Sequence, residues 1–348
     1  MDTAVVILNW NGLPWLQRFL ADVVLHTRGD ARLIVADNGS TDGSVAWIKA
    51  QQPEVEVITL SENLGFAGGY NAALAQVQST FYLLLNSDVE VTPGYVSALR
   101  SHLQAHPHLA ACQPKVLSQQ HRERFEHAGA AGGFIDRNGY PFCRGRIFEL
   151  TEEDHGQYDD DREVFWATGA CLMIRAADFH AMGGFDASLF AHMEEIDLCW
   201  RLRRAGRAIG YTAKAKVYHV GGGALGYGSP RKTYLNFRNS LVVLTRNMRS
   251  RWILLRILHR MLLDQFAALK FLFEGHADHA FQVGRAHRHF LGRLPALLRE
   301  RPEPAAMERE GGPTGLYHRS VAYDRYILGW RTFSELDGKA FDQPRRSK

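Results

Sequence analysis

Residues 32–44 read RLIVADNGSTDGS, an apolar, β-branched run that ends in an acid followed by a tight cluster of turn residues. Three more apolar runs have the same character: 4–8, 55–60 and 81–85. Helical patterns separate the runs, at about 14–28, 43–51 and 66–78. Strands that alternate with helices are typical of a parallel sheet that is buried on both faces. The sequence therefore predicts an α/β fold.

Each of the four apolar runs ends in asparagine, aspartate or glycine. These ends read Asn9-Trp10-Asn11-Gly12, Asp37-Asn38-Gly39-Ser40, Glu62-Asn63-Leu64-Gly65 and Asn86-Ser87-Asp88. Ligands of open α/β sheets bind beyond the carboxyl ends of the strands. We therefore expect the four ends to form one site.

The composition fits an ordinary globular protein, because 46% of the 348 residues are hydrophobic and 22% are charged. This length is enough for about two domains, or for one domain with a large extension. The net charge of +4 is small and indicates no nucleic-acid partner. Four cysteines stand apart without a CxxC pair: Cys112, Cys143, Cys171 and Cys199. This spacing, and an opening MDTAVVILNW that does not read as a signal peptide, predict core thiols and a cytoplasmic location.

Two acids stand at the ends of apolar runs. Asp37 could accept hydrogen bonds from a nucleotide base or ribose, although an Asx turn or a helix cap in this segment would explain the same residues. Asp88 is carried to the tip of a buried run. A single carboxylate is enough for Mg²⁺ there if phosphate oxygens and water complete the shell, since this ion keeps few protein ligands. An acidic turn is the structural alternative.

Three further acids stand at the start of a helix predicted from about 194 to 205: Glu194, Glu195 and Asp197. The helix dipole favours a charged carboxylate in the first turn. Such a carboxylate can act as a general base toward a hydroxyl within hydrogen-bond reach. First-turn acids are also common without any such role. His219 ends a short predicted strand before a glycine run, where a loop site is plausible, but a lone histidine is more often structural.

The chain changes character twice after the first strands. Residues 116–165 hold glycine and charge with few apolar runs, and we expect an irregular insertion or hairpin in a domain that spans 1–230. Residues 231–300 are helical and basic, and 301–348 are rich in Pro, Glu and Arg, which predicts a partly mobile tail. The apolar stretch 252–273 carries a polar stripe roughly 140° wide, which argues against a transmembrane helix. Two alternatives stay open: its apolar face packs on the domain, or it lies in a membrane interface.

Taken together, these segments resemble the family 2 glycosyltransferases, which have the GT-A fold, and most of all their bacterial rhamnosyltransferase-like members. The resemblance runs from residue 5 to about 239. It rests on VVILNWNG, VADNGSTDGS, ENLGFAGGYNAAL, YLLLNSDVEV, ATGACLMIR, GGFDASLFAHMEEIDLCWRLRRAG, AKVYHVGGG and RKTYLNFRN. It implies a Rossmann-like, mostly parallel central sheet with a C-terminal helical extension.

The resemblance also implies roles for single residues. Those near the nucleotide sugar would be Asn9, Asp37, Asn63, Gly65, Asn86, Trp166, Thr168, Gly169, Arg231 and Lys232. Arg231 and Lys232 belong to a loop at 226–232 that could close over the diphosphate. Asp88 and His219 would hold Mg²⁺ or Mn²⁺, although Asn86 stands where the family motif has a carboxylate. Glu195 would be the catalytic base, in place of the more usual aspartate, with Glu194 and Asp197 as alternatives.

The implied reaction is an inverting transfer in surface polysaccharide synthesis. The donor would be dTDP-rhamnose or a UDP-hexose, and the acceptor a glycan or a lipid-linked glycan, with possible peripheral attachment to the inner face of the cell membrane. A nucleotidyltransferase would carry a glycine-rich loop with a basic residue after the first strand, and an oxidoreductase would carry GxGxxG there. The first strand is followed by neither. A non-catalytic nucleotide-sugar binding module would not require Glu195.

Overall fold

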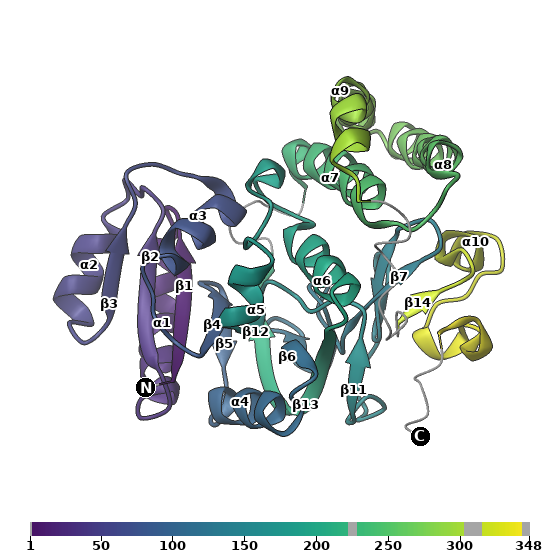
Figure 1. The fold of residues 1–348 in the computed structure, drawn as a ribbon. Helices are drawn as coiled ribbons and strands as arrows, with labels where there is room; N and C mark the ends of the chain where they lie inside the picture. Colours follow the sequence, from purple (N-terminus) through teal and green to yellow (C-terminus); the bar gives the residue numbers. More distant parts are fainter. Residues whose placement is uncertain (1, 222–227, 303–314, 343–348) are drawn as a thin grey trace.

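The computed structural model describes residues 2–221, 228–302 and 315–342 (Figure 1). The strands of its central sheet are β1 (Thr3–Asn9), β2 (Arg32–Asp37), β3 (Glu56–Thr59), β4 (Phe81–Asn86), β5 (Val89–Val91), β6 (Leu109–Ser118), β11 (Asp161–Val164), β12 (Cys171–Arg175) and β13 (Ala208–His219). Their order is β11-β13-β6-β12-β4-β1-β2-β3, with β5 paired to β13. The pairs joining β3, β2, β1 and β4 are all parallel. The predicted α/β fold is confirmed.

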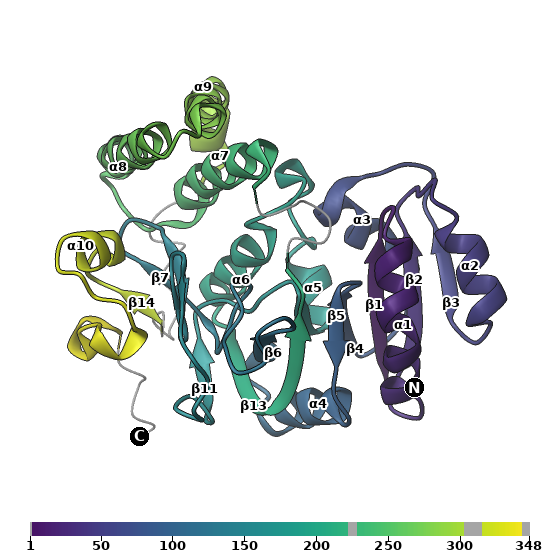
Figure 2. The same cartoon turned by 180° about the vertical axis from the view of Figure 1, so that it is seen from behind.

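Helices cover both faces of this sheet. They are α1 (Leu13–Thr27), α2 (Ser44–Gln51), α3 (Gly65–Leu74), α4 (Tyr95–Ala105), α5 (Ala176–Ala181) and α6 (Glu194–Arg204). Val5 and Ile7 of β1 point into a core shared with α1 and α4, whereas Ala4 and Val6 point into a core shared with α3 and α6. Figure 2 shows α1 in front of β1 and β2. Burial on both faces explains the continuous apolar runs.

Residues 116–165 are not irregular, and antiparallel strand pairing within this segment agrees with the hairpin alternative. Residues 116–165 include four short strands, namely β7 (Gly133–Asp136), β8 (Pro141–Cys143), β9 (Arg146–Ile147) and β10 (Leu150–Thr151). Together with β14 (Leu316–Tyr317) they form a second sheet in the order β10-β9-β8-β7-β14. Strands of two to four residues are too short to show a clear alternating pattern in the sequence.

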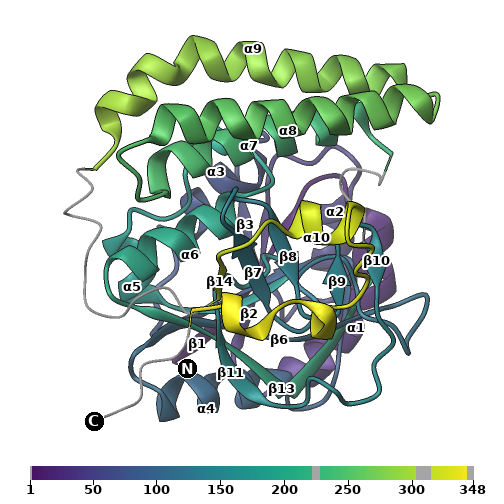
Figure 3. The ribbon, with the colours of Figure 1, turned by 90° about the vertical axis from the view of Figure 1, so that its right-hand side faces the viewer.

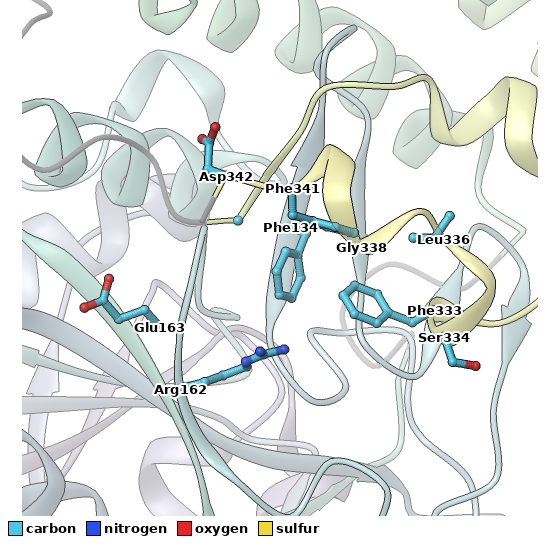
Figure 4. Close-up of a pocket in the computed structure, with 10 residues that line it drawn as sticks. Phe134, Arg162, Glu163, Phe333, Ser334, Leu336, Gly338, Phe341 and Asp342 are labelled. Atoms are coloured by element: carbon cyan, nitrogen blue, oxygen red, sulfur yellow. The ribbon is translucent and has the colours of Figure 1, made fainter. Parts of the chain in front are cut away.

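The described part of the C-terminal tail, 315–342, is folded onto this second sheet (Figure 3). It contains β14, α10 (Val321–Tyr326) and the 3-10 turns η3 (Phe333–Glu335) and η4 (Gly338–Ala340). Phe333 and Phe341 stack with Phe134 at 4.9 and 5.6 Å between ring centroids. These rings border a cavity of about 470 Å³ that also meets Arg162 and Glu163 (Figure 4). Aromatic packing holds this part of the tail, which was predicted to be partly mobile, and 303–314 and 343–348 lie outside the described residues.

Three long helices follow β13 and confirm the predicted helical region: α7 (Pro230–Asn247), α8 (Ile253–Phe273) and α9 (Ala277–Glu300). Figures 1 and 3 show α8 and α9 side by side in a layer above α7. Among the described residues, none of the helices combines the length and the apolar character that crossing a membrane requires. The four cysteines are free and buried, as predicted.

The packing of α8 disagrees with the first of the two alternatives, in which its apolar face packs on the domain. The buried side chains of α8 include Arg260 and Asp264 of the polar stripe. Arg260 Nε donates to Asp264 Oδ1 at 2.9 Å, and Tyr140 Oη donates to the same oxygen at 2.9 Å. His287 of α9 lies 3.2 Å from Asp264 Oδ2. Arg260 and Asp264 therefore face the domain beside Ile253 and Ile257, whereas most leucines of α8 lie outside.

Candidate active site

The ends of β1, β2 and β4 meet at one edge of the sheet, as expected. The register pairs Asn9 with Asp37 and Leu8 with Asn86. Asn9 Nδ2 donates to Asp37 Oδ1 at 3.1 Å, and Asp37 Oδ2 accepts from the Ser40 amide at 3.0 Å. Both side chains are buried, and within the described chain Asn9 Oδ1 has no hydrogen-bond partner. A buried acceptor without a partner costs free energy unless a ligand or water satisfies it.

The loop after β3 is held at this edge by Asn38. This residue follows β2, and the sequence analysis did not assign it to the site. Asn38 Nδ2 donates to Asn63 Oδ1 at 3.1 Å and to the Gly65 carbonyl at 3.0 Å. Asn63 Oδ1 also accepts from the Gly65 amide at 2.8 Å. Gly65 has φ +74°, and a Cβ there would meet the Phe190 ring at 2.6 Å. Asn63 and Gly65 therefore shape the loop that brings α3 against residue 190.

Asp88 and His219 come together because β5 pairs with the end of β13. The register sets His219 opposite Val89, and His219 Nε2 lies 3.2 Å from Asp88 Oδ1. On the other side of the ring, Nδ1 lies 3.0 Å from Oε2 of Glu126, which the sequence analysis missed. All three side chains are buried. Burial lowers the pKa of His219, but the charges of Asp88 and Glu126 outweigh it and raise the pKa to about 10.

Asp88 and His219 could hold a divalent cation once His219 has given up its Nε2 proton, because a histidine binds a metal in its neutral form. Carboxylate and imidazole are both ligands of Mn²⁺-type ions, and a histidine that binds a metal usually gives its other ring nitrogen to a carboxylate, as His219 does with Glu126. In the described ranges 2–221, 228–302 and 315–342, no group of three or more His, Cys, Asp or Glu side chains has the geometry of a metal site. Two protein ligands suit an ion that keeps phosphate oxygens and water.

The start of α7 carries the two predicted basic residues. Arg231 lies with its guanidinium 5.1 Å from the centre of the Phe190 ring. Lys232 is half-buried; burial lowers its pKa, and the charges of Glu126 and Asp88 act on it in the opposite direction. Lys232 thus lies within electrostatic reach of the Asp88 and His219 pair. Gly226 and Tyr227 of the predicted loop lie outside the described residues.

A strained turn leads into α6. Phe190, His192 and Met193 all have positive φ values, 67°, 68° and 75°. Such conformations cost free energy in residues other than glycine and persist only where surrounding contacts hold them. The holding group is Asn239 of α7, whose Nδ2 donates to the carbonyls of Leu189, Ala191 and His192 at 2.9, 2.9 and 2.7 Å. Asn239 was also missed, since its partners lie almost fifty residues away.

This turn delivers Glu194 and Glu195 to the edge of the sheet. The Asn86 amide donates to the Ala170 carbonyl at 3.0 Å, and a Cβ on the adjacent Gly169 would lie 3.9 Å from Glu195 Cβ. Oε2 of each glutamate is shielded from solvent and has no hydrogen-bond partner among the described residues. Burial raises the pKa of Glu195 to about 7 and holds that of Glu194, next to Glu195, well above its usual value.

Asp197 differs from the two glutamates, because both of its oxygens are occupied. Oδ2 accepts from Arg201 Nε at 2.7 Å, and Oδ1 accepts from Asn247 Nδ2 at 2.7 Å. The side chain is buried and ties α6 to α7. A carboxylate engaged in this way is poorly placed to receive a proton from a substrate, which leaves Glu194 and Glu195 as candidates.

Trp166 and Thr168 are packed in the interior. The Trp166 indole is buried and its Nε1 donates to the Phe134 carbonyl at 2.8 Å, while Gly133 lies so close that a Cβ would meet the ring at 2.2 Å. Thr168 Oγ1 accepts from the Ala170 amide at 3.1 Å. These contacts give both side chains structural roles, whereas Gly169 lies beside Glu195 itself.

A basic cavity of about 460 Å³ lies between α7 and α9, beside the strained turn. Its lining residues are Phe190, Arg231, Tyr234, Leu235, Arg238, Gln282 and Arg285. Arg238 donates to the carbonyls of Ser188 and Leu189, and the Arg285 guanidinium lies 4.8 Å from the centre of the Tyr234 ring. Three arginines in one cavity favour an anionic ligand.

Known proteins share both sequence and fold with this chain. The family model described as Glycosyl transferase family 2 matches residues 4–183. An N-acetylglucosaminyl-diphospho-decaprenol L-rhamnosyltransferase of Mycobacterium tuberculosis is 30% identical over 230 residues, which cover 62% of this chain and 75% of the relative. The low-salt glycan biosynthesis hexosyltransferase Agl10 of Haloferax volcanii is 24% identical over 244 residues, which cover 68% of this chain and 74% of that protein.

Two solved structures have similar backbones. S. aureus TarS 1-349 superposes with a TM-score of 0.53 at 16% identity, over 86% of this chain and 83% of that one. Mannosyltransferase PcManGT from Pyrobaculum calidifontis, in complex with GDP-Man and Mn²⁺, superposes with a TM-score of 0.53 at 12% identity, over 83% and 87%. At these identities the likeness shows the fold alone.

Proposed function

The chain belongs to glycosyl transferase family 2 and has the GT-A fold, and from this premise we propose that it is a metal-dependent, inverting glycosyltransferase with a nucleotide-diphosphate sugar as donor. The observation that carries the proposal is the pair Glu194 and Glu195, whose shielded Oε2 atoms have no partner in the described chain. They lie at the edge of the sheet where Asn9 and Asp37 also end. A ligand with hydroxyl groups would satisfy these acceptors.

The donor nucleotide would bind at the ends of β1 and β2. The partnerless Asn9 Oδ1 and the Asp37 carboxylate would accept hydrogen bonds from the base and ribose. Asp88 and His219 would hold Mg²⁺ or Mn²⁺ against the diphosphate, and Lys232 would add positive charge from the start of α7. When bound, this cation neutralises the charge that builds on the leaving diphosphate.

Glu195 is the proposed base. Its carboxylate would take the proton of an acceptor hydroxyl, and the hydroxyl oxygen would bond to the anomeric carbon on the face opposite the diphosphate. The bond from that carbon to the diphosphate breaks at the same time, and the diphosphate leaves with the electron pair. A single displacement inverts the anomeric carbon without a covalent intermediate. Burial supports this role, because a pKa near the working pH suits a general base.

For the sugar and the acceptor, we propose rhamnosyl transfer from dTDP-rhamnose to a lipid-linked diphosphate glycan in surface polysaccharide synthesis, in the cytoplasm. The 30% identical relative acts on N-acetylglucosaminyl-diphospho-decaprenol, as its name states. The basic cavity between α7 and α9 supports an acceptor of this class, since arginine binds phosphate through charge-assisted hydrogen bonds. A UDP-hexose remains the alternative donor.

Substituting Arg285 by alanine should raise the KM for such an acceptor about tenfold, because one charge-assisted hydrogen bond contributes about 1.5–3 kcal/mol. The KM for the donor should stay unchanged, since Arg285 lies on α9. Initial rates with a short-chain, water-soluble prenyl-diphosphate N-acetylglucosamine would measure both constants. Arg18→Ala, an exposed arginine on α1, is the matched control. Equal acceptor KM values in the two variants would refute the cavity as acceptor site.

Thermal unfolding with nucleotides tests the donor site directly. A ligand that binds only the folded chain raises its stability by mass action. We expect stabilisation by dTDP with Mn²⁺ or Mg²⁺, a smaller effect in EDTA, and none in Asp37→Ala. Stabilisation by UDP instead would shift the donor to a UDP-hexose. Absence of any response to dTDP, UDP and GDP with either metal would overturn the proposed donor site.

A further inference from the structure

The outward face of α8 is apolar along its whole length. Its exposed side chains, with their fractional exposure, are Leu254 56%, Leu255 59%, Leu258 56%, Leu262 55%, Phe266 69%, Leu269 47%, Leu272 51% and Phe273 89%. At 100° per residue these positions span about 120° of the helix surface. Their stripe lies on the side away from buried Arg260 and Asp264. We call it the α8 face.

A continuous apolar stripe of this size is unusual on a soluble surface and marks an interaction site. Within the described chain the stripe is not covered, because every member is at least 47% exposed. Trp252, 58% exposed, extends it at the N-terminal end, and Phe281 on α9, 66% exposed, adds to it beyond the turn between the helices. The helix has 21 residues, which makes the stripe about 30 Å long.

The charges around the α8 face are mostly positive. Arg251, His259 and Lys270 are exposed at its borders. The neighbouring helix α9 exposes Arg288 and Arg299, and Glu300 is exposed at its C-terminal end. Two exposed acids lie near the end of α8 and the start of α9, Glu274 and Asp278, and Glu274 is paired with Lys270 at 3.1 Å. This rim complements an anionic surface.

We propose that the α8 face docks onto an anionic lipid bilayer, with the helix lying in the plane of the interface. Exposed leucine and phenylalanine would enter the acyl boundary, while Arg251 and Lys270 would contact the headgroups. Trp252 at the helix end suits the level of the headgroups. Docking in this way holds the α7–α9 layer, and with it the basic cavity, next to the membrane surface.

A second copy of the chain fits this face less well. A symmetric dimer would press the same patch of two chains together. Such a pairing would also have to bury both copies of the exposed, mostly positive borders of the α8 face against each other, which is unfavourable. The positive rim is neutralised by anionic lipid instead.

Co-sedimentation of the full-length chain with vesicles tests this docking without requiring any enzymatic activity, so that its failure is distinguishable from failure of the proposed reaction. We expect binding to vesicles of phosphatidylethanolamine and phosphatidylglycerol, and weaker binding to phosphatidylcholine alone. Leu262→Gln with Phe266→Gln should lower the vesicle partition coefficient about tenfold or more, because the variant loses two large apolar side chains that would enter the acyl boundary.

The matched control carries the same changes at exposed apolar residues elsewhere, Leu25→Gln with Ile327→Gln, and should bind as the parent does. All positions are exposed, and thermal unfolding of both variants checks that they remain folded. Equal binding of the two variants would overturn the proposal. A second result would also overturn it: a parent chain that does not bind anionic vesicles and that sediments in the ultracentrifuge as a dimer. If Leu262→Gln with Phe266→Gln dissociated that dimer, the α8 face would be assigned to a second copy.

Discussion

Substituting Glu195 by glutamine should lower kcat about 10³-fold while the donor binds as before. General-base catalysis contributes about 10²–10⁴-fold to a rate, and glutamine keeps the size of the side chain but cannot accept the proton. Donor binding is assigned to Asn9, Asp37 and Asp88, none of which is altered. Single-turnover rates, together with nucleotide-dependent thermal unfolding, separate the two effects.

The transfer rate of the parent enzyme should depend on pH through the ionisation of Glu195. Glu195 must be ionised to act, and burial raises its pKa to about 7. The rate should therefore fall as pH is lowered through about 7, and this limb should be missing from the residual activity of Glu195→Gln. Glu123→Gln, an exposed glutamate, is the control and should keep the parent profile.

Above pH 7 the Glu195→Gln substitution should raise the free energy of unfolding, although it lowers the transfer activity. The raised pKa means that the folded chain holds the Glu195 proton more tightly than the unfolded chain, whose glutamate has a pKa near 4.5. This contribution is fully present below pH 4.5 and is lost as pH rises through 7. At pH 8, Glu195→Gln should have the higher free energy of unfolding, by on the order of 1–3 kcal/mol. A Glu195→Gln variant that keeps full activity would instead show that a different residue acts as the base.

Local patterns were enough to predict the first half of the fold. The four apolar runs became β1 to β4 with ends shifted by at most two residues, because strands buried on both faces leave an unbroken apolar signal. Their polar ends do meet at one edge, since parallel strands share a direction. The start of α6 at Glu194 was also predicted from its acids.

Residues that act through distant contacts could not be found in this way. Glu126 lies 93 positions from His219, its hydrogen-bonded partner, inside a segment without strand periodicity. Asn239 holds the turn at residues 189–192 from a helix that the sequence showed only as part of a helical, basic region. An amide or carboxylate that satisfies remote groups looks, in sequence, like any surface polar residue.

The orientation of α8 shows a second limit of prediction from the sequence. A helical wheel separates an apolar from a polar face but does not say which one meets the domain. Arg260 is turned inward because Asp264 and the carbonyls of Asn138 and Gly139 satisfy its guanidinium. Buried charges of this kind are tolerated only when paired. The two carbonyls belong to the turn between β7 and β8 of the second sheet, whose strands were not predicted.

Substituting Asp88 by asparagine should abolish the metal-dependent part of donor binding and lower the transfer rate by about 10³-fold, given that charge stabilisation by a bound cation contributes several kcal/mol. Binding of the nucleoside monophosphate, assigned to Asn9 and Asp37, should remain. Thermal unfolding with dTMP and with dTDP, each with Mn²⁺ and with EDTA, separates these contributions. In the variant, dTDP should stabilise equally with and without metal.

The control for Asp88→Asn must account for the ion pair that it breaks, because His219 is buried against Asp88 at 3.2 Å. Asp154→Asn removes a comparable partner elsewhere, at the buried Lys115 Nζ, 2.8 Å away. It should lower the unfolding temperature yet keep the full difference between Mn²⁺ and EDTA. If Asp88→Asn kept that difference as well, the cation would have to bind elsewhere, and Asp88 would be only the partner that holds His219 between two carboxylates. A difference lost in Asp88→Asn and kept in Asp154→Asn would instead tie metal binding to the β4–β5 turn, because a general loss of stability affects both variants alike.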